Sequence, residues 1–106
     1  MINLGVLVSG SGTNLQAIID SIEAGGLDAK IKIVISNNAN AYAIERAKTH
    51  NIPVFIIQDS HFQTREDSDR HIVEILKSHS VDLVVLAGFM RLLTPVLIKS
   101  FPMRII

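Results

Sequence analysis

The sequence predicts an α/β domain in which helices cover both faces of a parallel β-sheet. Short apolar runs rich in β-branched residues alternate with longer segments of helical periodicity, which is typical of parallel α/β sheets. The length of 106 residues suits one small domain and not two. Apolar residues make up 48% of the chain and charged residues 19%, which excludes intrinsic disorder.

The first strand and helix have the clearest patterns. A nearly continuous apolar run over residues 2–8 predicts a strand that is covered on both faces. A helix over residues 13–24 should follow, and Gly25-Gly26 should end it, since glycine adopts the left-handed conformation without a Cβ penalty. Its buried residues recur at the spacing of one helical face and are Leu15, Ile18, Ile19 and Ile22.

A second strand, a shorter helix and a third strand come next. Residues 31–35 predict the strand. Asn40 is the expected N-cap of a helix over residues 41–48, and Asn51 is its expected left-handed stop. Residues 54–57 predict the third strand.

The longest helix is expected between residues 60 and 78. Ser60 and Gln63 have the spacing of a capping box, so the helix should begin at Ser60. Its expected buried face consists of Ile72, Val73, Ile75 and Leu76.

The C-terminal part of the chain predicts two further strands. Residues 81–87 indicate the fourth strand, and Thr94-Pro95 is a typical N-cap and N1 pair for a short helix ending near Ser100. Residues 103–106 look like the beginning of a fifth strand. Right-handed crossovers and the strand order 3-2-1-4-5 would bring the loops after strands one and four side by side. The candidate site is therefore formed by residues 9–14 and 88–93.

The first of these loops predicts an anion site. Two glycines allow a tight turn at a helix N-terminus, and Ser11, Thr13 and Asn14 add side-chain donors. The alternative is a plain turn in which Thr13 only caps the helix. Leu15 occupies the place of the third glycine of a dinucleotide motif, and no Lys follows the glycines as in a Walker A loop. A monophosphate fits best, although a flavin mononucleotide loop has a similar composition.

The second loop is apolar around a single cation, Arg91. Met90, Leu92 and Leu93 suit the wall of a pocket for a flat heterocycle. Ordinary core packing with a solvated Arg91 explains the same residues equally well.

Several motifs together resemble the folate-dependent phosphoribosylglycinamide formyltransferases. They are SGSGTNLQAII, VISN with the alanines of residues 41–47, Thr-Arg-Glu of residues 64–66 with Asp69, and VDLVVLAGFMRLLTP. The similarity covers essentially the whole chain in the same order and spacing. Methionyl-tRNA formyltransferase and formyltetrahydrofolate deformylase match the first loop less well. The resemblance implies a Rossmann-like N-terminal domain over residues 1–106.

The resemblance also implies a reaction and a set of site residues. These enzymes move a formyl group from 10-formyltetrahydrofolate to the amine of glycinamide ribonucleotide in purine synthesis. By this resemblance, Gly12, Thr13 and Asn14 would hold the ribonucleotide phosphate. The folate would contact Arg65, Met90, Arg91, Leu92, Leu93 and Ile98. Arg65 is otherwise a solvated helix residue, and Ile98 otherwise a core residue.

The catalytic residues of these enzymes have no counterpart in the chain. Their Asn and His belong to an Asn-Ile-His-Pro motif that would begin after Ile106, and their Asp would follow later. We therefore expect no catalytic residue here, and a partner that is either the missing C-terminal half or a second copy joined through the C-terminal edge. The four histidines and the carboxylates of Glu45, Asp67 and Asp69 are interpreted as structural or surface groups.

Composition limits the remaining function classes. Ten Lys and Arg balance ten Asp and Glu, which argues against nucleic-acid binding and electrostatic membrane docking. The absence of Cys excludes disulfides and thiol catalysis, and the His spacing predicts no metal site. Without a membrane-spanning run or a signal peptide, we expect a cytoplasmic protein. A non-catalytic phosphate- or nucleotide-binding module and a flavin carrier are the competing functions.

Overall fold

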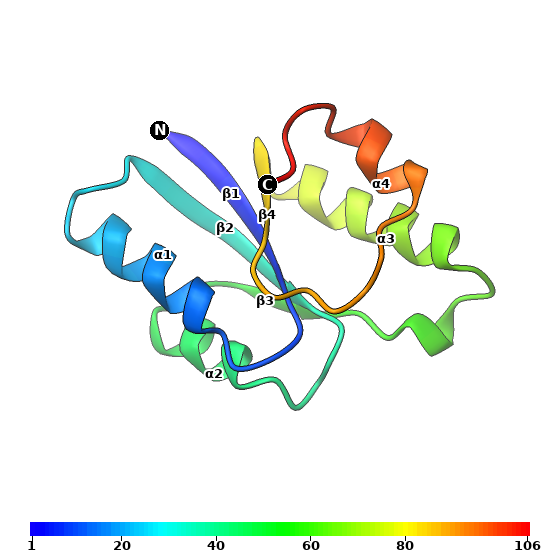
Figure 1. Ribbon diagram of the computed structural model, residues 1–106, viewed down its shortest axis with the longest axis horizontal. Helices are drawn as coiled ribbons and strands as arrows, with labels where there is room; N and C mark the ends of the chain where they lie inside the picture. Colours follow the sequence, from blue (N-terminus) through cyan, green and yellow to red (C-terminus); the bar gives the residue numbers. More distant parts are fainter.

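Four parallel strands in the order β3-β2-β1-β4 form the centre of the computed structural model, which describes all 106 residues (Figure 1). The strands are β1 (Ile2–Val8), β2 (Ala29–Ser36), β3 (Val54–Ile56) and β4 (Leu83–Leu86). Every neighbouring pair is parallel. The predicted class and the order of the first four strands are confirmed.

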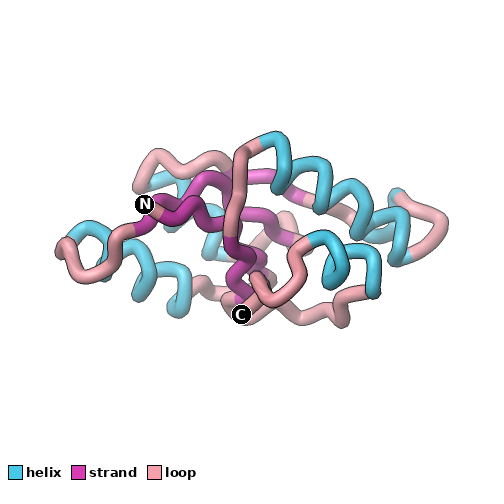
Figure 2. Tube along the Cα trace, turned by 90° about the horizontal axis from the view of Figure 1, so that it is seen from above, coloured by secondary structure: helices cyan, strands magenta, loops and turns pink.

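Helices cover both faces of this sheet, as Figure 2 shows from above. Their bounds are α1 (Thr13–Glu23), α2 (Tyr42–Thr49), α3 (Arg65–Ser78) and α4 (Pro95–Ser100), with a 3-10 turn, η1, over Asp59–His61. Gly25 and Asn51 have positive φ angles of 79° and 59°, so both predicted left-handed stops are confirmed. None of the helices is long and apolar enough to cross a membrane.

The core consists of two apolar clusters, one on each face. Val6 and Val8 of β1 pack with Leu15 and Ile19 of α1, whereas Leu7 packs on the opposite face among residues of α3 and α4. This alternation follows from the two-residue period of a strand. Because both sets are buried, β1 needs apolar residues on both sides, as the sequence pattern indicates.

The start of α3 differs from the prediction. Thr64 is the N-cap, and its Oγ1 accepts the N–H of Asp67 at 3.1 Å, whereas Ser60 lies in η1. The predicted capping box at Ser60 and Gln63 is therefore wrong. Thr64 is followed by the acidic residues Glu66 and Asp67 in the first turn, where the helix dipole favours negative charge.

Helix α2 begins without a side-chain cap. Ala41 is the N-cap, and Asn40 lies in the preceding turn, where its N–H donates to Asn38 Oδ1 at 3.0 Å. The prediction of Asn40 as cap is wrong. A carbonyl from another part of the chain serves the helix start instead, because Ala43 donates its N–H to the oxygen of Gly10 at 3.1 Å.

The predicted fifth strand does not form. Ile105 makes one isolated parallel bridge to Val84 at the outer edge of β4. Three backbone hydrogen bonds accompany it, including Val84 N–H to Arg104 O at 2.8 Å and Leu86 N–H to Ile106 O at 2.7 Å. Met103 has a φ of 59°, so the chain is extended only after that turn and too briefly for a strand.

Candidate functional site

The two predicted loops meet at the carboxyl ends of β1 and β4, at the lower end of these strands in Figure 1. A hollow of about 110 Å³ lies between them. It is lined by Gly10, Ser11, Gly12, Thr13 and Asn14 from the first loop and by Ala87, Gly88 and Met90 from the second. The expected juxtaposition of the two loops is present.

Backbone groups determine the shape of the first loop. Gly12 is the N-cap of α1 with a φ of 79°, and no side chain caps this helix. A Cβ on Gly12 would lie 2.7 Å from the Cα of Ala43 in α2, so only glycine fits there. Thr13 is the first helical residue and not the cap that the plain-turn alternative requires. The first N–H groups of α1 therefore have no acceptor within the helix, and they carry its positive dipole end.

A cation that the sequence analysis did not single out braces this loop. Arg46 of α2 donates from Nε to the oxygen of Ser11 at 2.8 Å and from a terminal nitrogen to Gln16 at 3.3 Å. Its guanidinium also lies 5.0 Å from the ring centre of Tyr42. Arg46 thus adds a positive charge beside the free N–H groups. No local sequence pattern predicts this contact, because Arg46 lies in α2, 35 positions after Ser11.

Ser9 joins the first loop to the second. Its side chain is buried, and its hydroxyl donates to Asn37 Oδ1 at 2.6 Å and accepts the N–H of Met90 at 2.8 Å. The Ser9 carbonyl accepts from the side-chain amide of Asn38 at 3.2 Å. The asparagines after β2 therefore support the loop after β1. This role was not predicted, and its one signal in the sequence is a serine directly after a buried strand, a polar group that needs partners.

Buried charges hold the second loop. The Arg91 side chain is only 5% exposed and pairs through Nε with Asp59 at 2.8 Å and through a terminal nitrogen with Asp69 at 2.6 Å. It also donates to Ser68 Oγ at 2.9 Å and to the Leu92 oxygen at 3.2 Å. The interpretation of Arg91 as solvated is wrong. A guanidinium has five N–H groups, and these four contacts use most of those of Arg91 inside the protein.

Asp69 corrects another expectation. It is fully buried, whereas the sequence analysis interpreted it as a surface charge of a helix. Its Oδ2 accepts both the N–H of Thr94, at 2.8 Å, and the Thr94 hydroxyl, at 2.7 Å. Asp69 therefore ties α3 to both Arg91 and the start of α4. The helical period alone did not reveal it, since an ion pair across elements overrides the preference of Asp for the surface.

The ionisation of Asp59 and Arg91 reflects this network. Burial by itself would raise the pKa of the Asp59 carboxyl, but hydrogen bonds from Ser68 and Arg91 and the charges of Arg91 and Arg65 lower it below its usual value. Burial likewise works against the charge of Arg91. The hydrogen bonds and charges of Asp59 and Asp69 outweigh it and raise the pKa of Arg91.

The other predicted folate contacts differ in exposure. Met90 is 81% exposed and Leu92 77%, and Ile98 is half exposed on α4. Leu93 packs partly against the core beneath, and Arg65 is exposed at the first residue of α3. The structure therefore leaves Met90, Leu92, Ile98 and Arg65 accessible, while Arg91 is committed to internal partners.

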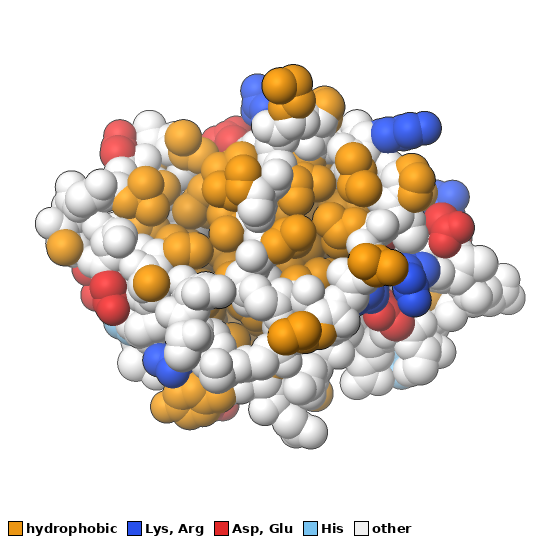
Figure 3. Space-filling view, viewed as in Figure 1, with side chains coloured by type: hydrophobic (Ala, Val, Ile, Leu, Met, Phe, Trp, Pro, Cys, Tyr) orange, Lys and Arg blue, Asp and Glu red, His pale blue; other side chains and the backbone are white.

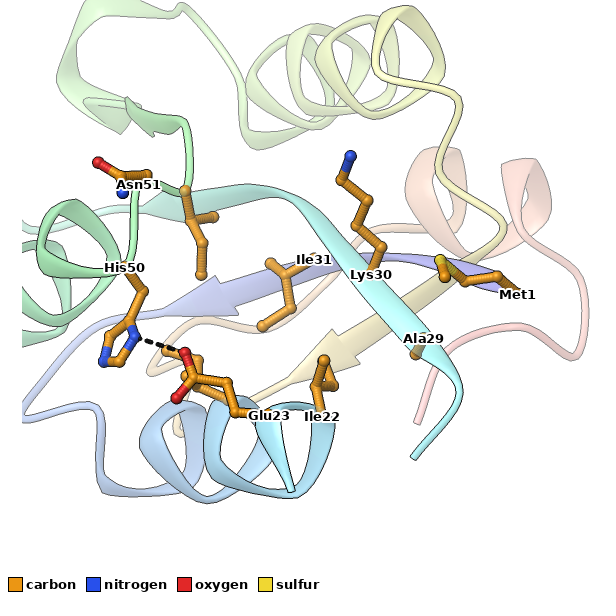
Figure 4. Close-up of a pocket in the computed structure, with 10 residues that line it drawn as sticks. Met1, Ile22, Glu23, Ala29, Lys30, Ile31, His50 and Asn51 are labelled. Atoms are coloured by element: carbon orange, nitrogen blue, oxygen red, sulfur yellow. Dashed lines mark hydrogen bonds and ion pairs between the residues drawn. The ribbon is translucent and has the colours of Figure 1, made fainter. Parts of the chain in front are cut away.

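None of the four histidines lines the hollow between the loops. A larger hollow, of about 360 Å³, is at the opposite end of the strands, where His50 Nδ1 pairs with Glu23 at 2.9 Å (Figure 4). The His71 ring packs near Phe55 and Phe62, and His79 Nδ1 lies 2.8 Å from the Ile75 oxygen. Each of these three rings has a structural contact, and none lines the hollow between the loops.

Comparisons with known proteins identify the family. The family described as "Formyl transferase" matches residues 2–106, and the chain belongs to it. The relatives within that family include enzymes named phosphoribosylglycinamide formyltransferase. The chain is 44% identical over 106 residues to phosphoribosylglycinamide formyltransferase of Haemophilus influenzae, covering all of this chain and 50% of that protein. It is 38% identical over 104 residues to the enzyme of the same name from Escherichia coli, covering 98% and 49%.

A solved structure supports the same relationship. Glycinamide ribonucleotide transformylase 1 from Symbiobacterium toebii superimposes with a TM-score of 0.97 at 42% identity, covering 99% of this chain and 50% of that one. The resemblance inferred from the motifs is thereby confirmed, and the flavin-carrier alternative loses its basis. The chain spans about half the length of the curated relatives it matches.

Proposed function

We propose that this chain forms the ribonucleotide- and folate-binding half of a cytoplasmic phosphoribosylglycinamide formyltransferase of purine biosynthesis. The observation that carries the proposal is the hollow between the two loops. A hydrogen bond from Met90 to Ser9 joins the two loops beside it. One side of it offers free helix N–H groups, and the other offers exposed apolar side chains. This pairing suits a phosphate on one substrate and a flat heterocycle on the other.

The phosphate end is assigned to Gly12, Thr13 and Asn14. Their N–H groups lie at the start of α1, where the dipole favours an anion. The Thr13 and Asn14 side chains are exposed and can add donors, and Arg46 supplies a positive charge nearby. The site is therefore built mainly from the backbone.

The folate end is assigned to Arg65, Met90, Arg91, Leu92, Leu93 and Ile98. Met90, Leu92 and Ile98 offer apolar surface to a pterin ring, and Leu93 lies partly buried behind them. The exposed Arg65 guanidinium suits the carboxylates at the other end of a folate. Arg91 contributes chiefly through its backbone, because its side chain is engaged with Asp59 and Asp69.

The chemistry requires groups that these loops do not supply. The ribonucleotide amine attacks the formyl carbon, the bond from that carbon to the folate nitrogen breaks, and one proton moves from the amine to that nitrogen. An acid/base group must carry this proton, and donors must stabilise the oxyanion. We assign these roles to the Asn, His and Asp of the second half of the enzyme, and residues 1–106 to the half that precedes them.

The C-terminal edge of the sheet, formed by residues 104–106 beside β4, is the proposed contact surface for that second half. Residues 104–106 bond to Val84 and Leu86 of β4, and no strand lies beyond them, so this short segment forms the free edge of the sheet on this side. Leu86 and Ile106 are 37% and 70% exposed, and Figure 3 shows apolar side chains gathered across the middle of one face. Unpaired edges invite strand addition, so without the second half we expect self-association here. Ile105→Lys should reduce that association in sedimentation experiments more than Met103→Lys does, because Met103 is fully exposed outside the bridge.

Two measurements test the assignment. Calorimetric titration with glycinamide ribonucleotide should show binding that glycinamide, which lacks the ribose phosphate, does not show. Incubation of the chain with that ribonucleotide and 10-formyltetrahydrofolate should produce no deformylated folate. Addition of a fragment carrying the second half should restore turnover. Equal binding of glycinamide would contradict the phosphate site, and turnover by the chain alone would contradict the division of roles.

A further inference from the structure

We propose that Ser9 is a positioning residue that couples the two substrate loops, so that a ligand on one loop strengthens binding at the other. The inference rests on the proposed function, since it assumes that the first loop holds a ribonucleotide phosphate and the second a folate. Ser9 itself touches neither substrate in this scheme. It acts through the backbone N–H of Met90.

Hydrogen bonds at Ser9 connect the two loops. The Met90 N–H donates to Ser9 Oγ at 2.8 Å, and the Ser9 hydroxyl donates onward to Asn37 Oδ1 at 2.6 Å. This is the only hydrogen bond between loops 9–14 and 88–93. The hydroxyl uses its one proton on Asn37, so it is oriented to accept from Met90.

The surroundings make Ser9 a fixed point. Its residue is 8% exposed, and its carbonyl is held by the Asn38 side chain. Asn38 is itself held, because Ser36 Oγ donates to its carbonyl at 2.8 Å and accepts its N–H at 3.1 Å. The polar residues Ser36, Asn37 and Asn38 at the end of β2 therefore hold Ser9 in place. Chains of hydrogen bonds of this kind strengthen one another.

In the second loop, the restraints beside Met90 come from its two neighbours and not from Met90 itself. Gly88 has a φ of 74°, and nothing lies within 4 Å of where its Cβ would be. The Met90 side chain is exposed, and the one hydrogen bond that Met90 itself makes is from its N–H to Ser9. Phe89 before it packs partly against the core, with its ring centre 5.7 Å from the Arg91 guanidinium, and Arg91 after it pairs with Asp69.

Coupling follows from this arrangement. A phosphate bound by the first loop restrains residues 10–14 and with them Ser9, which in turn restrains Met90. A folate that binds to an already ordered Met90 loses less conformational freedom on binding. Linkage requires the reverse effect to be equal in size. A serine that merely satisfies a backbone N–H would give no such mutual effect.

The test measures each ligand with and without the other. Glycinamide ribonucleotide is titrated into the chain by calorimetry, alone and in the presence of saturating tetrahydrofolate, and tetrahydrofolate is titrated in the same two ways. This pair of ligands has no formyl group to transfer, so no reaction disturbs the measurement. In the wild type, each ligand should tighten the other about fivefold or more. Ser9→Ala should bring this factor close to one, and Ser9→Thr, which keeps the hydroxyl, should restore it. Ser78→Ala is the matched control, because the Ser78 hydroxyl donates a hydrogen bond to the Ile75 carbonyl in α3, away from both loops.

Amide exchange at Met90 provides a second readout that needs no variant. Glycinamide ribonucleotide should slow the exchange of the Met90 N–H in the wild-type chain, although Met90 is assigned to the folate side. The inference is overturned by unchanged exchange at Met90, by independent binding of the two ligands, or by full coupling in Ser9→Ala. If the ribonucleotide itself fails to bind, the proposed function fails. If both ligands bind independently, only the coupling fails.

Discussion

The two loops of the site are held in place by opposite means. The first is shaped by backbone geometry, with Gly12 wedged against Ala43 and a helix start left without a side-chain cap. The second is fixed by the buried guanidinium of Arg91, which pairs with the buried Asp69 and the partly exposed Asp59. The first loop therefore keeps its donors free for a ligand, whereas the second uses its one strong donor group for internal structure. The charge of a residue inside a predicted binding motif can thus serve the structure of the loop, as the Arg91 guanidinium does.

The largest expected effect tests the buried charges under the second loop. Asp69→Asn removes the charge that faces Arg91 and leaves that guanidinium buried with a weakened partner set. We expect a loss of about 3 to 5 kcal/mol in the free energy of unfolding, measured by urea denaturation. Asp67→Asn is the control, since its pair with Arg70 is exposed and should matter by less than about 1 kcal/mol. Equal losses in the two variants would show that the buried network is not what holds this loop.

The second prediction concerns the wedge in the first loop. Gly12→Ala places a methyl group 2.7 Å from the Cα and Cβ of Ala43 and forces a residue with a Cβ into a φ of 79°. We expect a loss of about 2 to 4 kcal/mol in unfolding free energy together with the loss of ribonucleotide binding. The cause differs from direct obstruction of the ligand, because the clash is with α2.

Gly10→Ala is the matched variant for that experiment. Nothing lies within 4 Å of its added Cβ, and its φ is not positive. Its unfolding free energy should stay within about 0.5 kcal/mol of the wild type. A Gly12 variant as stable as the Gly10 variant would contradict the wedge.

The pH dependence of stability distinguishes the loops further. The pKa of Asp59 is lowered in the folded protein, so its contribution is present above the unfolded pKa and is lost as pH falls through the folded one. The stability difference between wild type and Asp59→Asn should therefore be largest at neutral pH and shrink below about pH 4. The effect should be modest, because the Asp59 side chain is 38% exposed. A difference that is constant from pH 7 to pH 3 would exclude this linkage.

The contrast also explains how far the sequence could predict the structure. Glycines at a strand–helix junction and apolar periodicity are local signals, so the four strands, the helices and the meeting of the loops could be predicted. Asp69 and Ser9 obtain their roles from partners 22 and 81 positions away, and no local pattern marks those distances. The predicted start of α3 is wrong because Ser60 and Gln63 have the spacing of a capping box, whereas the N-cap is Thr64, which the acidic residues of the first turn follow.

The smallest expected effect tests how completely the first loop depends on its backbone. Thr13→Ala would cost about 1 kcal/mol if Thr13 capped α1, but Gly12 is the N-cap and no side-chain cap exists. The unfolding free energy should therefore change by less than about 0.5 kcal/mol, since the side chain is exposed. Ribonucleotide affinity should fall by no more than about tenfold, the worth of one hydrogen bond from a neutral hydroxyl. Calorimetry on Thr13→Ala beside Thr13→Ser, which keeps the hydroxyl, separates the two contributions. A loss of binding as complete as that of Gly12→Ala would mean that a side chain, and not the helix start, holds the phosphate.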